Sequence, residues 1–402
     1  MRKFVGFIWL MVLIWGCARL PVFTYPDPFD TSDKAINYQE KKVFDSDPAV
    51  FADNLFDGAR LNGFDRMNDS SFVVTIQPEN EPINPSPWYA FRVWSKKAQT
   101  IHLYFDYGKY KHRYYPKVSS NGQLWADMDS ARVINDSIGV FQYLKIPLSQ
   151  DTIWIAGQEV VASREVKTWT EELAEQEGVE FRSFGKSRQD RDMIALDIDR
   201  NPKARNPVLV VLSRQHPPEV TGYRAMQFFV EELLSGDSLS EVFLNKARVL
   251  VLPLMNPDGV DLGHWRHGAG GVDLNRDWAV YQQPEVRQAV DFINHETRKR
   301  KVIMGIDFHS TYHDVFYTND TLSTRPYMKS DWFEFMESQI EDYEVNERPS
   351  AITRPVSKSW FFSMFGVEGV TYEVGDDTPE ELIELKGRVS ARSVMRAFLS
   401  EN

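Results

Sequence analysis

Residues 207–222 read PVLVVLSRQHPPEVTG, and this stretch decides how the second half of the chain folds. The unbroken apolar run at 208–212 is typical of a strand that is buried on both faces of a parallel sheet. Apolar residues with helical spacing follow at 219–236, so the stretch predicts a strand, a turn and a helix in succession. The turn places His216 and Glu219 three residues apart beside two prolines, where Gly, Asn or Ser is common. It is either a helix start that contains a histidine or the first half of a metal site.

The same alternation of buried strands and helices continues towards the C-terminus. Apolar runs occur at 247–255, 301–308 and 367–374, and a long stretch with helical spacing occurs at 284–300. Continuous apolar strands interleaved with helices are typical of α/β proteins. We therefore expect residues 161–402 to form an α/β domain with a mixed, mostly parallel sheet and helices on both faces.

The first half of the chain has a different pattern. Short runs rich in β-branched and aromatic residues, such as SFVVTIQP and TIHLYFDYG, are separated by turn clusters such as PENEPINPSP. Many short strands without helical spacing between them favour an antiparallel β-sandwich. We expect this domain to span residues 41–160, directly ahead of the α/β domain.

The N-terminal segment MRKFVGFIWLMVLIWGC has the pattern of a targeting signal, with two basic residues, a short apolar run and a Gly-Cys pair. The apolar run is too short for a convincing membrane-spanning helix. Its end resembles a bacterial lipobox, which implies a lipoprotein signal peptide at residues 1–17 and a lipid-modified Cys17. Residues 18–40, rich in Pro, Asp and Thr, are then expected to be a tether. The protein would be a membrane-anchored lipoprotein outside the cytoplasm, on the periplasmic or outer-membrane face; an ordinary signal peptide or a core cysteine is the alternative.

The net charge and the cysteine content argue against nucleic-acid binding and against disulfide bonds. The chain of 402 residues has a formal net charge of -12, whereas nucleic-acid-binding proteins carry clustered Lys and Arg. We therefore expect no nucleic-acid partner. Cys17 is the single cysteine of the chain, so the mature protein is expected to contain no disulfide.

Polar side chains follow the buried strands at the points where the strands end. His216 and Glu219 follow the first apolar run, His309 follows the run at 301–308, and Glu373 lies near the end of the last one. In open α/β sheets the ligand crevice lies beyond the carboxyl ends of the strands, so these side chains should converge. Two imidazoles and one carboxylate bind Zn²⁺ and leave one position open. The sequence thus predicts one zinc ion per chain, bound by His216, Glu219 and His309.

The motifs that carry these residues resemble, in order and spacing, those of the zinc carboxypeptidases, also called funnelins. They are HPPE, NPDG, an arginine ahead of GVDLNRDW, DFHS and TYEVG, and they lie within residues 207–376. In the first half, FADNLFDGARLNGF, WYAFRV and LYFDYGKYKHRYYP resemble the β-sandwich that precedes the catalytic domain in the cytosolic carboxypeptidases, the deglutamylase branch. The resemblance implies a zinc-dependent hydrolase that removes residues from peptides with a free C-terminus.

The resemblance also implies catalytic roles. Glu373 would be the general base for the attacking water and would then protonate the leaving amine. Arg266 would polarise the scissile carbonyl and stabilise the oxyanion. Asp273 would accept a hydrogen bond from the outer N–H of His216 and so fix the tautomer of that ligand.

Substrate binding is assigned in the same way. Asn275 and Arg276 would bind the free C-terminal carboxylate, to which a guanidinium can donate two parallel hydrogen bonds. Counting back from Glu373 by the family's spacing reaches Lys358, which at the floor of the side-chain pocket would select an acidic residue; the alternative is an exposed Lys358 that points into water. The digestive carboxypeptidases have a substrate-capping tyrosine shortly before the catalytic glutamate, whereas the stretch NERPSAITRPVSKSWFF contains none.

Two other functions stay open from the sequence. A cell-wall γ-D-glutamyl-diaminopimelate peptidase or an amide deacylase of the same superfamily would use the same metal on a different substrate. A catalytically inactive binding lipoprotein would require zinc ligands to be lost, and all are present. Four histidines without an evident role are expected at the surface or around the site: His264, His267, His295 and His313.

Overall fold

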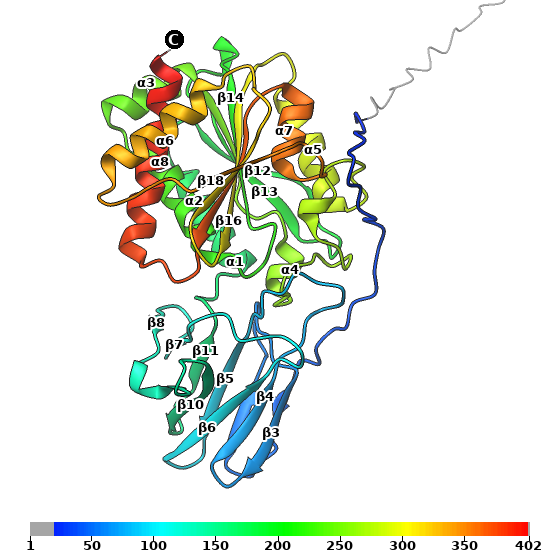
Figure 1. Ribbon diagram of the computed structural model, residues 1–402, viewed down its shortest axis with the longest axis vertical. Helices are drawn as coiled ribbons and strands as arrows, with labels where there is room; N and C mark the ends of the chain where they lie inside the picture. Colours follow the sequence, from blue (N-terminus) through cyan, green and yellow to red (C-terminus); the bar gives the residue numbers. More distant parts are fainter. Residues whose placement is uncertain (1–19, 401–402) are drawn as a thin grey trace, which may run out of the picture.

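A computed structural model of the protein describes residues 20–400, which form two parts joined end to end (Figure 1). Strands dominate residues 43–156, and a sheet flanked by helices forms the part from residue 163 onwards. The boundary predicted near residue 160 falls in the connection between these two parts. The predicted signal peptide, with Cys17, lies outside the described residues.

The first part is a sandwich of two sheets. One sheet has the strand order β1-β2-β5-β11-β7-β8 and the other β3-β4-β6-β10-β9, and neighbouring strands are antiparallel apart from the pair β4 and β6. Both sheets contribute to one hydrophobic core, in which Phe72, Phe91 and Leu103 are fully buried. The strands are β1 Val43–Phe44, β2 Val50–Asp53, β3 Gly63–Asn68, β4 Ser71–Thr75, β5 Ala90–Ser95, β6 Gln99–Asp106, β7 Lys117–Ser119, β8 Ala126–Asp127, β9 Val133–Asn135, β10 Phe141–Leu148 and β11 Ile153–Ala156.

The second part is built around one eight-stranded sheet with the order β12-β13-β15-β14-β16-β19-β17-β18. Its centre is parallel, because β14 pairs in parallel with β15 and β16, and β16 pairs in parallel with β19. All side chains of β14 and β15 are buried, which explains why both sequences, apart from Ser213 and Arg248, are apolar without alternation. The strands are β12 Val179–Lys186, β13 Asp192–Ile198, β14 Val208–Ser213, β15 Arg248–Leu252, β16 Val302–Thr311, β17 Val315–Asn319, β18 Glu347–Ser350 and β19 Gly369–Gly375.

Helices cover both faces of this sheet (Figure 1). Helices α2, α3, α6 and α8 share one hydrophobic cluster with one face, and α5 and α7 share another cluster with the opposite face. The predicted fold class, a mixed and mostly parallel α/β sheet preceded by an antiparallel sandwich, is confirmed. The helices are α1 Ser163–Leu173, α2 Val220–Leu233, α3 Ser238–Lys246, α4 Pro257–Asp261, α5 Pro284–Glu296, α6 Tyr327–Gln339, α7 Ser357–Phe365 and α8 Glu380–Ser400.

The segment predicted to be a tether is held against the α/β part. Residues 20–40 contain no helix or strand, but they follow the surface of that part over much of its length. The backbone N–H of Phe23 donates to the carbonyl oxygen of Ala279, and that of Lys34 donates to the carbonyl oxygen of Gly270. Residues 20–40 are therefore not a free tether, because their backbone forms hydrogen bonds with the α/β part.

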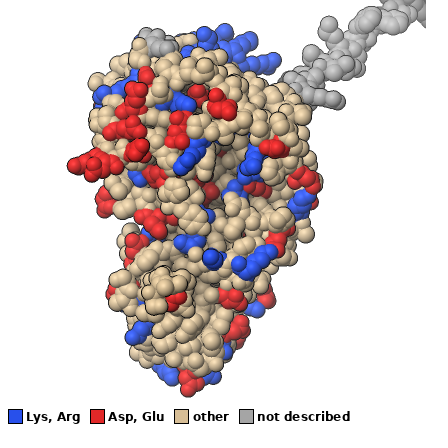
Figure 2. Space-filling view, viewed as in Figure 1, with Lys and Arg blue, Asp and Glu red and all other residues tan. Residues whose placement is uncertain are grey.

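The surface carries charges of both signs. On the face shown in Figure 2, basic and acidic side chains are interspersed, and no continuous basic stripe crosses this face. In residues 20–400, no helix is both long enough and apolar enough to cross a membrane.

Close packing of α2 against β16 sets the geometry of the sheet edge. A Cβ atom on Gly222 would lie 2.1 Å from the carbonyl oxygen of His309, so a larger side chain would push the helix away from this strand. The N–H of Gly222 and the hydroxyl of Thr221 both donate to Oγ of Ser310, over 2.8 Å and 2.9 Å. The first turn of α2, which follows Glu219, is thereby held at the end of the strand that carries His309.

Candidate metal centre and active site

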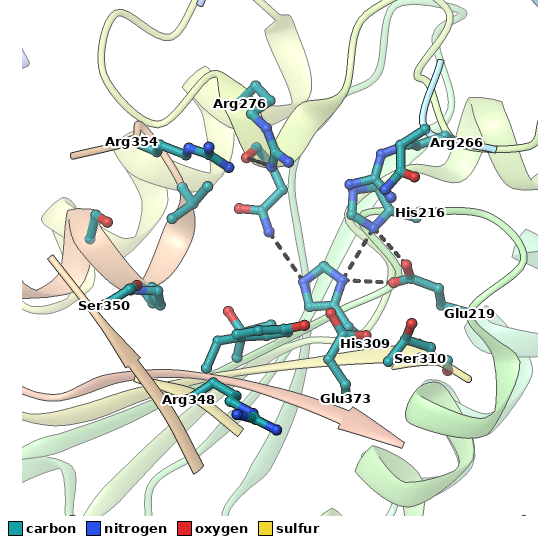
Figure 3. A pocket seen from close by; sticks show the side chains of 18 of the residues that line it. His216, Glu219, Arg266, Arg276, His309, Ser310, Arg348, Ser350, Arg354 and Glu373 are labelled. Carbon is teal, nitrogen blue, oxygen red and sulfur yellow. Dashed lines mark hydrogen bonds and ion pairs between the residues drawn. The ribbon is translucent and has the colours of Figure 1, made fainter. Parts of the chain in front are cut away.

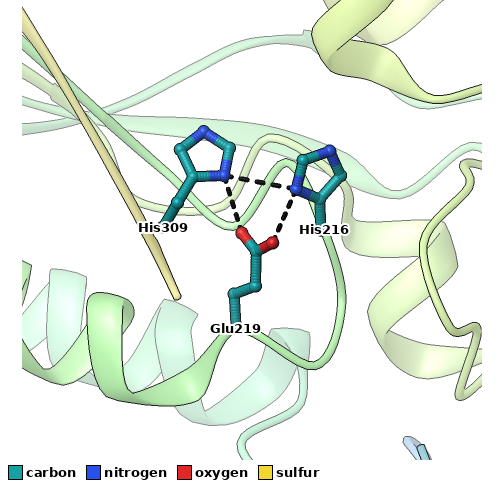
Figure 4. Close-up of side chains that lie close together, drawn as sticks. All are labelled: His216, Glu219 and His309. Atoms are coloured by element: carbon teal, nitrogen blue, oxygen red, sulfur yellow. Dashed lines mark hydrogen bonds and ion pairs between the residues drawn. The ribbon is translucent and has the colours of Figure 1, made fainter. Parts of the chain in front are cut away.

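His216, Glu219 and His309 lie together at the carboxyl edge of the sheet (Figure 4). His216 lies in the turn after β14, Glu219 immediately precedes α2, and His309 lies near the end of β16. The two carboxylate oxygens of Glu219 lie 2.8 Å from Nδ1 of His216 and 2.6 Å from Nδ1 of His309. The two Nδ1 atoms are 3.2 Å apart, and all three side chains are buried. The structure thus brings the three predicted zinc ligands to one point.

The outer nitrogen of each imidazole faces a further carboxylate. Nε2 of His216 lies 2.9 Å from Oδ1 of Asp273, and Nε2 of His309 lies 2.8 Å from Oδ2 of Asp307. With the ring proton on Nε2 in each case, both Nδ1 lone pairs point at the Glu219 carboxylate, which has no proton to share. Such an arrangement is repulsive unless a cation lies between the three groups. Because two imidazoles and one carboxylate are a common ligand set for Zn²⁺, the residues present fit a zinc ion.

The charges of the site perturb one another. Burial raises the pKa of Glu219, but without a metal ion the positive charge that the two imidazoles carry when protonated outweighs burial and lowers the pKa; a cation bound between the three groups would act in the same direction. Burial also opposes ionisation of Asp273, yet attraction to Arg266, His216 and Arg276 holds the pKa of this carboxyl well below its usual value. Both groups therefore stay ionised at neutral pH, as a metal ligand and a hydrogen-bond acceptor must.

Glu373 lies beside these ligands on β19 (Figure 3). It is the register partner of His309 on the neighbouring strand, and its Oε2 atom is buried without a hydrogen-bond partner in the part of the chain that the structure describes. Burial and repulsion from Glu219 raise the pKa of Glu373 to about 7. An unpaired carboxylate with a raised pKa at a cavity wall has the properties of a general base.

Arg266 and Asp273 come from the long loop between α4 and α5. Nε of Arg266 donates to Oδ2 of Asp273 over 2.7 Å, so one carboxylate holds both Arg266 and His216. Asp273 also caps a short 3₁₀ turn, because its Oδ1 accepts the backbone N–H of Asn275 over 2.9 Å. Arg266 lines the cavity, where its guanidinium lies near His216 (Figure 3).

Asn275 and Arg276 line the same cavity. Nδ2 of Asn275 lies 3.5 Å from Nε2 of His309, and Oδ1 of Asn275 accepts the backbone N–H of Ser357 over 2.9 Å. Nη1 of Arg276 donates to the carbonyl oxygen of Asn275 over 2.8 Å, and the side chain is 22% exposed. A partly exposed guanidinium at a cavity wall suits a carboxylate ligand.

Lys358 lies at the start of α7 and is only 7% exposed. Its Nζ atom donates to three uncharged oxygens, those of the Thr318 carbonyl (3.0 Å), the Asn319 amide (2.8 Å) and the Ser350 hydroxyl (3.1 Å). Burial lowers the pKa of Lys358 to about 8. The alternative in which this lysine points into water does not hold, because the side chain is buried at the cavity wall.

The cavity has a volume of about 620 Å³, and residues that were not predicted from the sequence lie in its wall or behind the metal ligands. Asp307 had a usable signal, because it precedes His309 by two residues and so lies on the same face of β16. Tyr317 on β17 places a tyrosine at the cavity, although none occurs shortly before Glu373. Arg113 lines the cavity although it belongs to the β-sandwich. No local sequence pattern predicts that a residue of this part lies beside the α/β part.

Comparison with known proteins agrees with this geometry. Residues 166–358 match the family model described as zinc carboxypeptidase. The chain carries a zinc carboxypeptidase domain. The three candidate zinc ligands lie inside the matched range, and Glu373 lies 15 residues beyond its end (373 less 358).

Relatives of the zinc carboxypeptidase domain include two cytosolic carboxypeptidases. Cytosolic carboxypeptidase 2 of Danio rerio is 36% identical over 108 residues, which are 25% of this chain and 14% of that protein. Cytosolic carboxypeptidase 6 of Caenorhabditis elegans is 23% identical over 242 residues, which are 56% of this chain and 53% of that protein. The chain thus spans about half or less of the length of these relatives.

The shared fold extends beyond the zinc carboxypeptidase domain. The crystal structure of a metallo-carboxypeptidase from Burkholderia cenocepacia has a TM-score of 0.73 to this chain at 16% identity. The similarity covers 88% of this chain and 100% of that chain, which is more than the α/β part alone can provide. That protein therefore shares the fold of both parts.

We predict that the purified protein contains about one zinc ion per chain and that His309→Ala abolishes tight zinc binding, because only two ligands remain. Asp307→Asn should retain the ligands but weaken zinc binding by about 10- to 100-fold, since partners of metal-bound histidines have effects of this size. Metal analysis after dialysis and competition with a chromophoric chelator measure both effects. His295→Ala is the control, because this side chain is 76% exposed on α5. A full zinc content in His309→Ala would contradict the ligand assignment.

Proposed function

We propose that the protein is a zinc-dependent metallocarboxypeptidase that removes C-terminal residues, acidic ones in particular, from peptides. The observation that carries this proposal is the convergence of His216, Glu219 and His309 on one point, with the unpaired carboxylate of Glu373 beside them. The match of residues 166–358 to the zinc carboxypeptidase family supports it.

The proposed chemistry assigns proton transfer to Glu373. The chemistry that zinc supplies when bound at the three ligands is Lewis-acid activation of a water molecule and of the scissile carbonyl. Glu373 takes a proton from the attacking water and gives it to the nitrogen of the leaving residue when the peptide bond breaks. Its position suits both steps, because the buried Oε2 atom has no hydrogen-bond partner among the described residues that would compete for the proton.

Arg266 and the Asn275–Arg276 pair act on the substrate. The guanidinium of Arg266, fixed by Asp273, stabilises the negative charge that develops on the carbonyl oxygen. Asn275 and Arg276 bind the free C-terminal carboxylate, which places the last peptide bond next to Glu373.

Basic residues around the cavity favour an acidic substrate. Arg113, Arg348, Arg354 and Lys358 all line it, in a chain whose net charge is -12. The buried Lys358 donates hydrogen bonds only to uncharged oxygens among the contacts described, and Asp320 and Glu368 act on it electrostatically without such a bond. An acidic side chain of the substrate would therefore supply a directly bonded counter-charge. We therefore assign Lys358 to the pocket for the last side chain of the substrate.

A comparison of substrates separates this proposal from its rivals. The zinc-loaded protein, with and without a chelator, is incubated with a peptide library and with muropeptides, and the products are identified by mass spectrometry. Trimming of ordinary peptides from the C-terminus supports the carboxypeptidase. Turnover of muropeptides alone would indicate the cell-wall γ-D-glutamyl-diaminopimelate peptidase, and binding without turnover would indicate the inactive lipoprotein.

Glu373→Gln should lower kcat by about 10²- to 10⁴-fold while zinc content and KM stay near those of the native protein, because only proton transfer is lost. Steady-state kinetics and metal analysis measure these quantities. Glu285→Gln is the matched control, since Glu285 is a buried carboxyl on α5 away from the cavity. An active Glu373→Gln protein would assign the base to another residue.

Native protein should cleave peptides that end in Glu with a higher kcat/KM than peptides that end in Leu, and Lys358→Met should reduce this ratio by about 100-fold, the effect of an unpaired buried charge. Because the pKa of Lys358 is about 8, the preference should be present below pH 8 and fall as the pH rises above it. Lys329→Met is the control, since Lys329 pairs with Glu347 over 2.6 Å and does not line the cavity. Equal rates for both peptides in the native protein would contradict the pocket.

We further propose that a lipid on Cys17 anchors the protein to a membrane outside the cytoplasm, an idea that rests on the sequence pattern of residues 1–17. Cys17→Ser should move the protein from the membrane fraction to the soluble fraction, because the attachment atom is lost. Fractionation of cells that express either form measures this. An unchanged distribution would mean that Cys17 is not the anchor.

A further inference from the structure

A carboxylate of the β-sandwich is buried against the loop that carries Arg266. Glu79 lies in the connection between β4 and β5, and its side chain is fully buried. Its Oε2 atom accepts the backbone N–H of Trp265 over 2.7 Å, and its Oε1 atom accepts those of Arg266 over 2.9 Å and His267 over 2.6 Å. Three successive backbone N–H groups around one anion form a nest, a geometry that orients the backbone as well as binding the charge.

The charges around Glu79 favour its ionised form. Burial raises the pKa of this carboxyl, but His264, Arg60 and His267 outweigh burial and lower it. His264 and His267 are themselves buried in the contact between the two parts of the chain. Of the two places expected for these histidines, the surface and the surroundings of the site, their burial excludes the surface.

The neighbouring residues hold the same loop. Asn80 is bonded through Oδ1 to Nδ1 of His267 over 2.6 Å and donates through Nδ2 to the carbonyl oxygen of Gly271 over 2.9 Å. The indole of Trp265 is fully buried in the core of the β-sandwich and donates to the carbonyl oxygen of Trp88 over 3.1 Å. The loop is therefore folded on the sandwich, although it belongs in sequence to the α/β part.

The backbone that Glu79 binds, residues 265–267, carries a side chain of the candidate active site. Arg266 is the middle residue of the three that bind Glu79, and its guanidinium donates to Asp273, which also faces His216. A small displacement of this backbone would move the guanidinium away from the cavity wall that it lines. Misplacement of a catalytic group by about 1 Å can cost roughly 100-fold in rate.

We propose that Glu79 is a positioning residue, which acts through the backbone of residues 265–267 to hold the Arg266 guanidinium where the oxyanion forms. The β-sandwich then supplies part of the catalytic machinery, and the α/β part alone has a misplaced arginine. This inference rests on the proposed function of Arg266.

The test combines Glu79→Gln with Arg266→Ala in a double-mutant cycle. Glu79→Gln keeps the shape of the side chain but removes the charge and turns an amide NH₂ group towards a backbone N–H. We expect kcat on a peptide that ends in Glu to fall by about 10- to 100-fold with KM and zinc content retained. In the Arg266→Ala background the same substitution should cause no further loss, because its effect passes through Arg266. Equal losses in both backgrounds would overturn the inference.

Hydrogen exchange of the zinc-free protein gives a readout that does not depend on activity. Peptides that cover residues 263–272 should exchange faster in Glu79→Gln than in the native protein, because three N–H groups lose an ionised acceptor. Asp53→Asn is the matched control, since Asp53 is a buried sandwich carboxylate that pairs with Arg92 over 2.7 Å, and it should change neither kcat nor this exchange. Unchanged exchange in Glu79→Gln would overturn the inference.

If Glu79→Gln does not fold, Glu79→Asp takes its place in the same measurements. This variant keeps the carboxylate, but its side chain is one methylene group shorter, so the carboxylate lies farther from the three N–H groups. A native protein without turnover on any peptide would count against the proposed function. Faster exchange in residues 263–272 would then still show that Glu79 holds the Arg266 loop, so the two failures can be distinguished.

Discussion

Parallel hydrogen bonding between β14, β16 and β19 is the constraint on which the site depends. Because these strands are neighbours and run in the same direction, the turn after β14, the end of β16 and the end of β19 meet at one edge of the sheet. His309 and Glu373 are register partners across two of these strands, and the turn after the third supplies His216 and Glu219. A slip of one residue in this register would turn His309 or Glu373 to the opposite face of the sheet.

The metal ligands could be predicted because they follow strands that the sequence shows clearly. His216, Glu219, His309 and Glu373 all stand at the ends of apolar runs, and the carboxyl ends of parallel strands converge. Contacts between distant segments could not be predicted in this way. No local pattern indicates that Glu79 binds the loop at 265–267, since that contact depends on how the two parts of the chain pack.

Segments without regular structure were the least predictable. Residues 20–40 have the composition of a tether, and composition alone says nothing about the hydrogen bonds that hold this segment to the α/β part. The position of Lys358 was predicted by counting residues back from Glu373. An error of one residue in this count would have assigned the pocket to a neighbouring serine instead. The overall net charge of -12 also gave no indication that Arg113, Arg348 and Arg354 line the cavity.

The most direct test of the proposed carboxypeptidase compares one peptide prepared as a free acid and as a C-terminal amide. Asn275 and Arg276 are assigned to the terminal carboxylate, so the zinc-loaded protein should require that group. Mass spectrometry of the products should show single residues lost from the free acid and none lost from the amide. Equal trimming of both peptides, or cleavage at an internal bond, would contradict the assignment.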